Sequence, residues 1–195
     1  MNALVLANRH TGERLELRRL RRNGDVWLEL KGTLPPHRQG PPMHIHFAED
    51  EEGHVLAGTL SASVNGQVVT VPAGKSTALP RGLPHRWWND GEELLVFEGY
   101  AKPVVDLDRY LQAVFEVLNA GPDRRPPLFY MAHAALRHRE TQAVLLMPAP
   151  IQAVLFRAVV ALGTLLGKYR GEDWPGCPAR CTGAPVAVES VAPAT

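Results

Sequence analysis

The sequence predicts a barrel of antiparallel β-strands followed by an α-helical extension, and three observations support this. Apolar and polar residues alternate along much of the first half, which is the period of a half-buried strand. Turn residues such as Asn65-Gly66 separate these strands at short intervals. After Pro103 the apolar residues recur with a helical period. We therefore expect a β-barrel over residues 1–102, a helical extension over 103–171 and a flexible tail over 172–195.

The chain is expected to begin with a strand and a hairpin. No basic start, apolar run and small-residue cleavage site opens the sequence, so Met1–Leu6 is predicted to be a strand rather than a signal peptide. The strands around Leu15–Leu17 and Val26–Leu30 flank Asn23-Gly24-Asp25, which favours a hairpin turn. Four arginines surround this turn, and we expect a solvated hairpin tip rather than a phosphate-binding patch: Arg18, Arg19, Arg21 and Arg22.

Two histidines mark the next predicted strand. In Met43-His44-Ile45-His46-Phe47, strand alternation projects His44 and His46 from one face and Ile45 from the other. Two imidazoles placed in this way can chelate a metal ion. Four acidic residues follow closely, and each offers a carboxylate near that pair: Glu49, Asp50, Glu51 and Glu52.

A third histidine follows a second strand-turn-strand passage. His85 comes directly after Leu79–Pro84, a segment rich in turn residues. On a strand, His85, Trp87 and Asn89 share one face, which places Trp87 beside the third imidazole. The neighbouring strands are predicted over residues 60–64, 67–71 and 93–100.

Two separate stretches of the chain resemble the two sequence motifs of the cupin superfamily. The first motif is similar to Gly40-Pro41-Pro42-Met43-His44-Ile45-His46 with Glu51 and Gly58, although Gly40 stands closer to the first histidine than is usual. The second is similar to the intervals between Gly74, Pro80, Gly82, His85 and Asn89. The resemblance implies a small single barrel of jelly-roll type and does not extend beyond about Lys102. It also implies four metal ligands, with the interval to Gly58 selecting the carboxylate: His44, His46, Glu51 and His85.

The implied ligand set predicts the class of metal and of chemistry. Three neutral imidazoles and a carboxylate suit Fe, Mn, Ni, Zn or Cu without distinguishing among them. An octahedral metal would keep two positions open for dioxygen and an oxygen-bearing substrate, or for polarising a carbonyl. Glu51 could also act as a catalytic base. Met43, Phe47 and Trp87 are expected to line a substrate pocket, or to be barrel core, and Gly53 to widen the pocket or form a bulge.

Three helices are predicted after the barrel. An amphipathic helix is indicated by the spacing of Leu107, Leu111, Val114, Phe115 and Leu118. A second helix is expected over residues 128–139 and a third over about 150–168. The third is apolar on nearly every side and must be covered. We expect burial in an oligomer interface or against the barrel rather than membrane association through residues 144–167, because that run contains two prolines, Gln152 and Arg157.

Composition limits the partners and the location. The formal net charge of +1 and the lack of a basic helix-turn-helix argue against nucleic acid, and a homodimer is the expected assembly. Cys177 and Cys181 are expected to be free thiols in a reducing cytoplasm, with a disulfide as the alternative. The sequence thus predicts a metal-dependent enzyme of the dioxygenase type acting on a small organic substrate. The alternative is a non-catalytic ligand-binding or sensing module whose helices contact a partner or a membrane.

Overall fold

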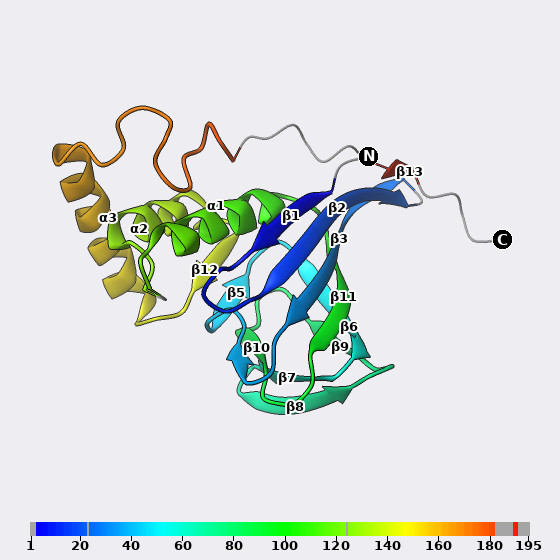
Figure 1. The fold of residues 1–195 in the computed structure, drawn as a ribbon. Coiled ribbons are helices and arrows are strands. Elements are labelled where there is room, and N and C mark those ends of the chain that lie inside the picture. Colours follow the sequence, from blue (N-terminus) through cyan, green and yellow to red (C-terminus); the bar gives the residue numbers. More distant parts are fainter. Residues whose placement is uncertain (1–2, 23, 124, 182–188, 191–195) are drawn as a thin grey trace.

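Two antiparallel sheets form the barrel in a computed structural model that describes residues 3–22, 24–123, 125–181 and 189–190 (Figure 1). The first sheet has the order β1 (Leu4–Ala7), β2 (Arg14–Arg22), β3 (Asp25–Leu34), β11 (Leu95–Lys102), β6 (Asp50–Ala57) and β9 (Ser76–Leu79), with β13 (Glu189–Ser190) parallel to β2. The second has the order β12 (Gln142–Val144), β5 (His44–His46), β10 (His85–Asn89), β7 (Thr59–Val64) and β8 (Gln67–Pro72), with β4 (Arg38–Gln39) beside β10. The predicted jelly-roll barrel with a helical extension is confirmed.

Alternation and turn chemistry explain why these strands form. Asn65 and Gly66 have φ angles of 49° and 82°, which a two-residue hairpin turn between β7 and β8 requires. On the first sheet, leucines at alternate positions of β2 point inward, and Leu17 is fully buried. The core between the sheets consists mainly of aliphatic residues and Phe97: Leu6, Leu15, Leu17, Leu28, Leu34, Val55, Leu60, Val71, Leu95 and Phe97.

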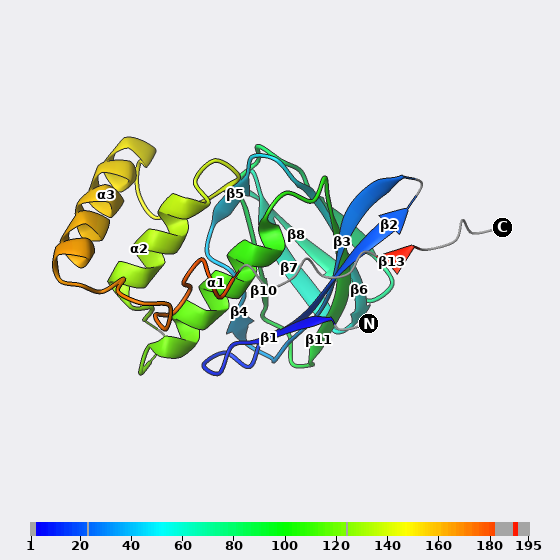
Figure 2. The same cartoon turned by 90° about the horizontal axis from the view of Figure 1, so that it is seen from above.

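The three helices lie side by side beyond one end of the barrel. They are α1 (Leu107–Ala120), α2 (Leu128–Arg137) and α3 (Ala149–Leu165). Figure 2 shows α1 nearest the barrel, α2 next to it and α3 outermost. The predicted apolar stripe of α1 faces the barrel, because Leu107 and Phe115 belong to its core and Leu111 packs against it.

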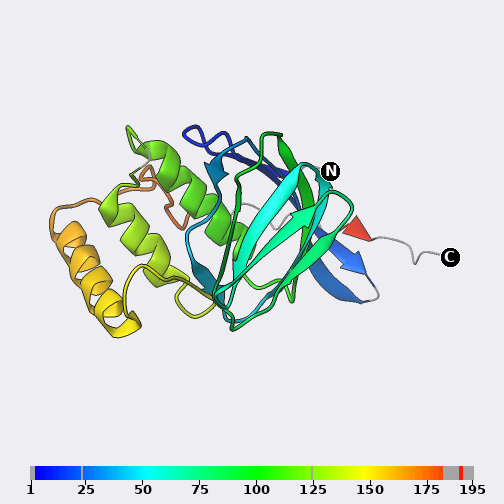
Figure 3. The same cartoon turned by 90° about the horizontal axis from the view of Figure 1, so that it is seen from below.

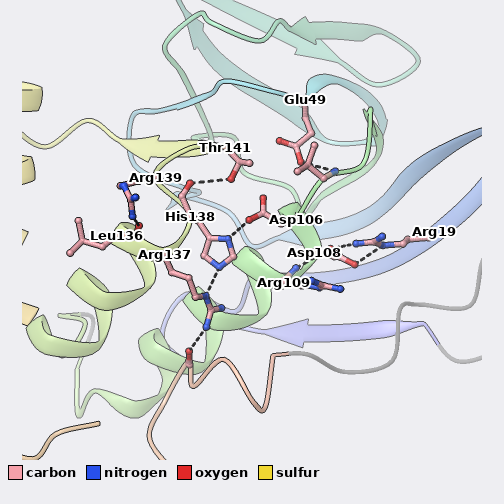
Figure 4. A network of polar contacts seen from close by, with 12 residues as sticks. Arg19, Glu49, Asp106, Asp108, Arg109, Leu136, Arg137, His138, Arg139 and Thr141 are labelled. Carbon is pink, nitrogen blue, oxygen red and sulfur yellow. Dashed lines mark hydrogen bonds and ion pairs between the residues drawn. The ribbon is translucent and has the colours of Figure 1, made fainter. Parts of the chain in front are cut away.

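Buried polar contacts attach α1 to the barrel and to α2, as Figure 4 shows. Arg19 of β2 donates two hydrogen bonds to Asp108 of α1, at 2.8 and 2.7 Å. Asp106, just before α1, contacts His138 at the end of α2 through a 2.5 Å hydrogen bond. Of the four arginines near the hairpin, Arg19 is therefore not solvated, since its side chain is only 14% exposed.

The helical extension also contributes a strand that the sequence did not predict. β12 pairs antiparallel with β5, which places Gln142 opposite His46 and Val144 opposite His44. Three residues are too few for a period of two to stand out, and they precede an apolar helix. The barrel sheet is therefore completed by residues beyond the first 102.

The third helix departs from its expected burial against the barrel. It packs on α2, with Phe156 and Gly163 buried, and a Cβ at Gly163 would lie 2.6 Å from the Tyr169 hydroxyl. Figure 3 shows α3 on the side of α2 that faces away from the barrel. Its outer face leaves large apolar side chains exposed: Ile151, Val154, Leu155, Leu162 and Leu165. Among the described segments, no helix combines the length and apolarity that crossing a membrane requires.

The first part of the expected flexible tail is packed. Trp174, Cys177 and Cys181 are buried, and the Trp174 ring contacts Tyr130 and His133 of α2. These contacts arise from single aromatic and thiol side chains in a segment rich in Pro and Gly, which has no period to detect. Both cysteines are free. Of the remaining tail, residues 182–188 and 191–195 lie outside the described residues.

Candidate metal centre

Four side chains from three strands converge inside the barrel. His44 and His46 project from β5, Glu51 from β6 and His85 from β10. Each offers one ligand atom, and these atoms lie within 4.8 Å of one another. The Nε2 atoms of His46 and His85 are each 3.7 Å from Oε2 of Glu51. The strand register causes this convergence, because His85 pairs directly with His44 across the second sheet.

Backbone carbonyls orient two of the three imidazoles. Nδ1 of His44 lies 2.9 Å from the carbonyl oxygen of Pro42, and Nδ1 of His85 lies 2.9 Å from that of Leu83. A carbonyl only accepts, so Nδ1–H is the donor in each pair and the Nε2 lone pair stays free. Nε2 of His85 is buried without a hydrogen-bond partner among the described residues. A buried, unpartnered nitrogen beside a carboxylate is the arrangement expected of a metal ligand.

Burial and mutual repulsion set the charges of the cluster. Burial, together with the neighbouring His46 and His85, lowers the pKa of His44 to about 4. Burial also lowers the pKa of His46. For Glu51, burial alone would raise the pKa, but the imidazoles of His46, His85 and His44 outweigh it and hold the pKa at about 2. At neutral pH His44 and His46 are thus neutral imidazoles and Glu51 is a carboxylate anion, which are the forms that bind a metal cation.

A cavity of about 570 Å³ adjoins the cluster. His44, His46 and Glu51 lie in its wall, and the other lining residues are mostly apolar. One wall is α1, which contributes Leu107, Tyr110, Leu111, Val114, Phe115 and Leu118. The volume falls within the range of small-molecule binding sites, and the walls have their usual character. The site can therefore place an organic molecule of moderate size against the four candidate ligands.

The predicted pocket residues divide into one that lines the cavity and two that do not. Trp87 lines the cavity and packs edge-on against Phe97. Met43 and Phe47 are not among the lining residues, and Phe47 is 46% exposed. The reason is strand alternation, because residues next to His44 and His46 point to the opposite face. Met43 and Phe47, which were expected in the pocket, therefore lie outside the lining of this cavity.

Gly53 widens the cavity rather than forming a bulge. It lies in β6 with regular pairing to Gly99 on one side and Thr77 on the other. A Cβ at this position would meet nothing within 4 Å, and Gly53 itself lines the cavity. The absent side chain therefore leaves open space on the face that carries Glu51.

Glu13 is a buried acidic residue of the cavity that was not predicted from the sequence. Glu13 lines the cavity although it is only 7% exposed, and burial raises its pKa to about 7. It precedes β2 and continues the inward-facing series of Leu15 and Leu17. The sequence signal for Glu13 is its spacing: an acidic residue two positions before Leu15 and four before Leu17 lies on the same face as these buried leucines.

Comparisons with known proteins agree with the motifs. A family profile described as a cupin domain matches residues 31–99. The oxidoreductase iacF of Pestalotiopsis fici is 32% identical over 120 residues, which cover 60% of this chain and 52% of that protein. The chain thus spans about half the length of this curated relative.

Solved structures of cupin type are also similar to the chain. A sugar phosphate isomerase of the cupin superfamily from Silicibacter pomeroyi is 19% identical, with a TM-score of 0.41, over 48% of this chain and 60% of that one. KdgF from Halomonas sp. is 16% identical, with a TM-score of 0.40, over 48% and 83%. With both motifs, the strand order and the profile match in agreement, residues 31–99 form a cupin domain.

Proposed function

We propose that this protein is a metal-dependent oxidoreductase of the oxygenase type, acting on a small and mainly apolar organic substrate. The observation that supports the proposal most strongly is the cluster of His44, His46, Glu51 and His85, of which the first three lie in the wall of a mainly apolar cavity. The similarity to a protein named as an oxidoreductase points to the same reaction class. The metal is proposed to be a divalent transition ion, and iron would supply activation of dioxygen beside the substrate.

The protein's own residues would contribute positioning and proton transfer. Backbone carbonyls orient the imidazoles of His44 and His85, and His44, His46 and Glu51 lie in the cavity wall where a substrate would bind. Glu51 is an anion at neutral pH and could accept a proton from a substrate hydroxyl. The apolar wall formed by α1 and Trp87 would exclude water and strengthen electrostatic interactions inside the cavity.

Oxygen uptake tests this function. The protein is loaded with iron(II) and mixed with a panel of hydroxylated aromatic compounds while dioxygen is recorded. We expect substrate-dependent uptake that His44→Ala abolishes and His37→Ala retains, because His37 is an exposed surface residue paired with Glu92. Uptake that survives in His44→Ala, together with unchanged metal content, would exclude the proposal.

A second function is favoured by the exposed face of α3. The barrel could bind a ligand without turnover and pass its state to a partner or membrane through this helix. Truncation after Lys102 cannot separate the two functions, since it would remove β12 from the barrel sheet and α1 from the cavity wall. The double variant Leu162→Gln/Leu165→Gln changes only the exposed face. An enzyme should keep its turnover in this variant, whereas a relay should bind ligand normally but lose its partner.

A further inference from the structure

The cavity extends well beyond the candidate metal ligands. Its lining follows α1 from Leu107 to Leu118, which at the rise of an α-helix is a distance of about 16 Å. The segment just before α1 lies close to the metal cluster, because Glu49, two residues before Glu51, accepts a hydrogen bond from the Val105 amide at 3.2 Å. The metal cluster therefore occupies the end of the cavity where α1 begins.

Glu13 occupies the other end. Asn119, in the last turn of α1, donates a hydrogen bond to the Ala7 carbonyl oxygen at 2.7 Å and accepts one from the Arg9 amide at 2.9 Å. Ala7 pairs with Arg14, the residue that follows Glu13. The hairpin that carries Glu13 is thus held at the end of α1, a helix length away from the imidazoles.

Glu13 lines the cavity, and its carboxyl group has no protein partner among the described residues. The residue is 7% exposed and lines the cavity, and none of the described residues forms a hydrogen bond or ion pair with its carboxyl oxygens. Its recorded hydrogen bonds involve only its backbone: the amide donates to Oγ1 of Thr11 and the carbonyl accepts from Asn8. A buried carboxyl group without partners is destabilising, so its retention calls for a group that binds it.

We propose that Glu13 binds a hydrogen-bond donor at the far end of the substrate, so that this site takes elongated apolar molecules with oxygen ligands at one end and an amino or hydroxyl group at the other. This inference rests on the proposed function only in placing the oxygen end at the metal. The carboxyl group accepts the donor's hydrogen, and the apolar walls between the two ends bind the body of the molecule. A molecule with two apolar ends would leave Glu13 unpartnered and bind more weakly.

Matched pairs of probe ligands test the proposal. The probes are catechols with a straight alkyl chain of increasing length that ends in either a primary amine or a methyl group. Their dissociation constants are measured by calorimetry on four proteins that contain all 195 residues: wild type, Glu13→Gln, Glu93→Gln and His85→Ala. Glu93 is exposed and does not line the cavity, so Glu93→Gln controls for the loss of one carboxylate.

The expected result is a chain length at which the amine binds wild-type protein about tenfold or more tightly than the methyl probe, as a charge-assisted hydrogen bond predicts. Glu13→Gln should remove this preference and Glu93→Gln should keep it. If Glu13→Gln does not fold, Glu13→Asp should move the preference to a longer chain, because its side chain is one methylene shorter. No preference at any length, or a preference retained in Glu13→Gln, would overturn the proposal.

His85→Ala separates this proposal from the proposed function. Both probes should bind this variant less tightly than wild type, because the catechol loses its metal, yet the amine should keep its advantage through Glu13. Equal catechol binding by wild type and His85→Ala would contradict the metal-centred function and leave the result on Glu13 intact. Absence of binding by every probe to the wild type would overturn both.

Discussion

Replacing Glu13 by glutamine should make the stability of the fold less dependent on pH. Burial raises the pKa of Glu13 from its ordinary 4.5 to about 7, so the folded protein holds this proton more tightly than the unfolded chain does. Between these two pH values the folded state binds more protons, and stability therefore falls as pH rises. Well below pH 4.5 the carboxyl group is neutral in both states and the cost of burying its charge is absent, whereas above about pH 7 the full cost of burying the anion is present.

The size of the effect follows from the shift in pKa. A rise from 4.5 to about 7 corresponds to about 3 kcal/mol of unfolding free energy, at 1.36 kcal/mol for each pKa unit. Glutamine has the same shape and no charge, so Glu13→Gln should gain up to about 3 kcal/mol over wild type at pH 8 and almost nothing at pH 4.

Urea unfolding at a series of pH values measures this difference. Metal-free protein is used, so that protons displaced by a metal do not contribute. Subtracting the variant from wild type cancels other groups with shifted pKa values, such as Glu49. Glu93→Gln is the control and should run parallel to wild type. Parallel curves for Glu13→Gln would refute the reasoning, because the carboxyl group would then be as well solvated in the fold as in the unfolded chain.

Two further predictions concern the attachment of α1 and the space beside the ligands. Asp108→Asn should destabilise the fold by about 3 kcal/mol in chemical unfolding, because it leaves the Arg19 guanidinium buried without its carboxylate. As a control, Glu16→Gln removes the partner of the more exposed Arg18 and should lower the unfolding free energy by less than about 1 kcal/mol. Equal losses of stability in the two variants would show that burial of the Arg19–Asp108 pair has no consequence. Gly53→Ala should raise thermal stability, by about 0.5–1 kcal/mol, since a strand gains from alanine and the new Cβ meets nothing within 4 Å. Gly32→Ala should lower it, because its Cβ would lie 2.2 Å from the Phe97 ring; the reverse order in a melting experiment would contradict the packing described above.

The barrel and its ligands were predictable because their signals are periodic or carried by motifs. Alternation alone placed His44 and His46 on one face, and the cupin resemblance added Glu51 and His85 from distant parts of the chain. The structure brings these four together. The same alternation should have excluded Met43 and Phe47 from the pocket, since neighbours of an inward-facing residue point outward.

The features that were not predicted from the sequence depend on tertiary contacts that no local sequence pattern encodes. β12 has three residues, and its pairing with β5 is fixed by the helices that precede and follow it. Glu13 becomes a cavity residue only because α1 covers that end of the barrel. Trp174 is buried by aromatic contacts from α2 within a segment whose composition suggests mobility. Tertiary packing, rather than propensity, determines each of these.

Metal content tests the central claim most directly. Untagged protein is purified without chelators, and the wild type, His85→Ala and His54→Ala are analysed for transition metals side by side. His54 is the matched control, because it lies on β6 and contacts Ser76 outside the cluster. We predict near-stoichiometric metal in the wild type and His54→Ala, and its loss in His85→Ala. Equal metal in all three proteins, or none in the wild type after reconstitution with iron(II), would contradict the account.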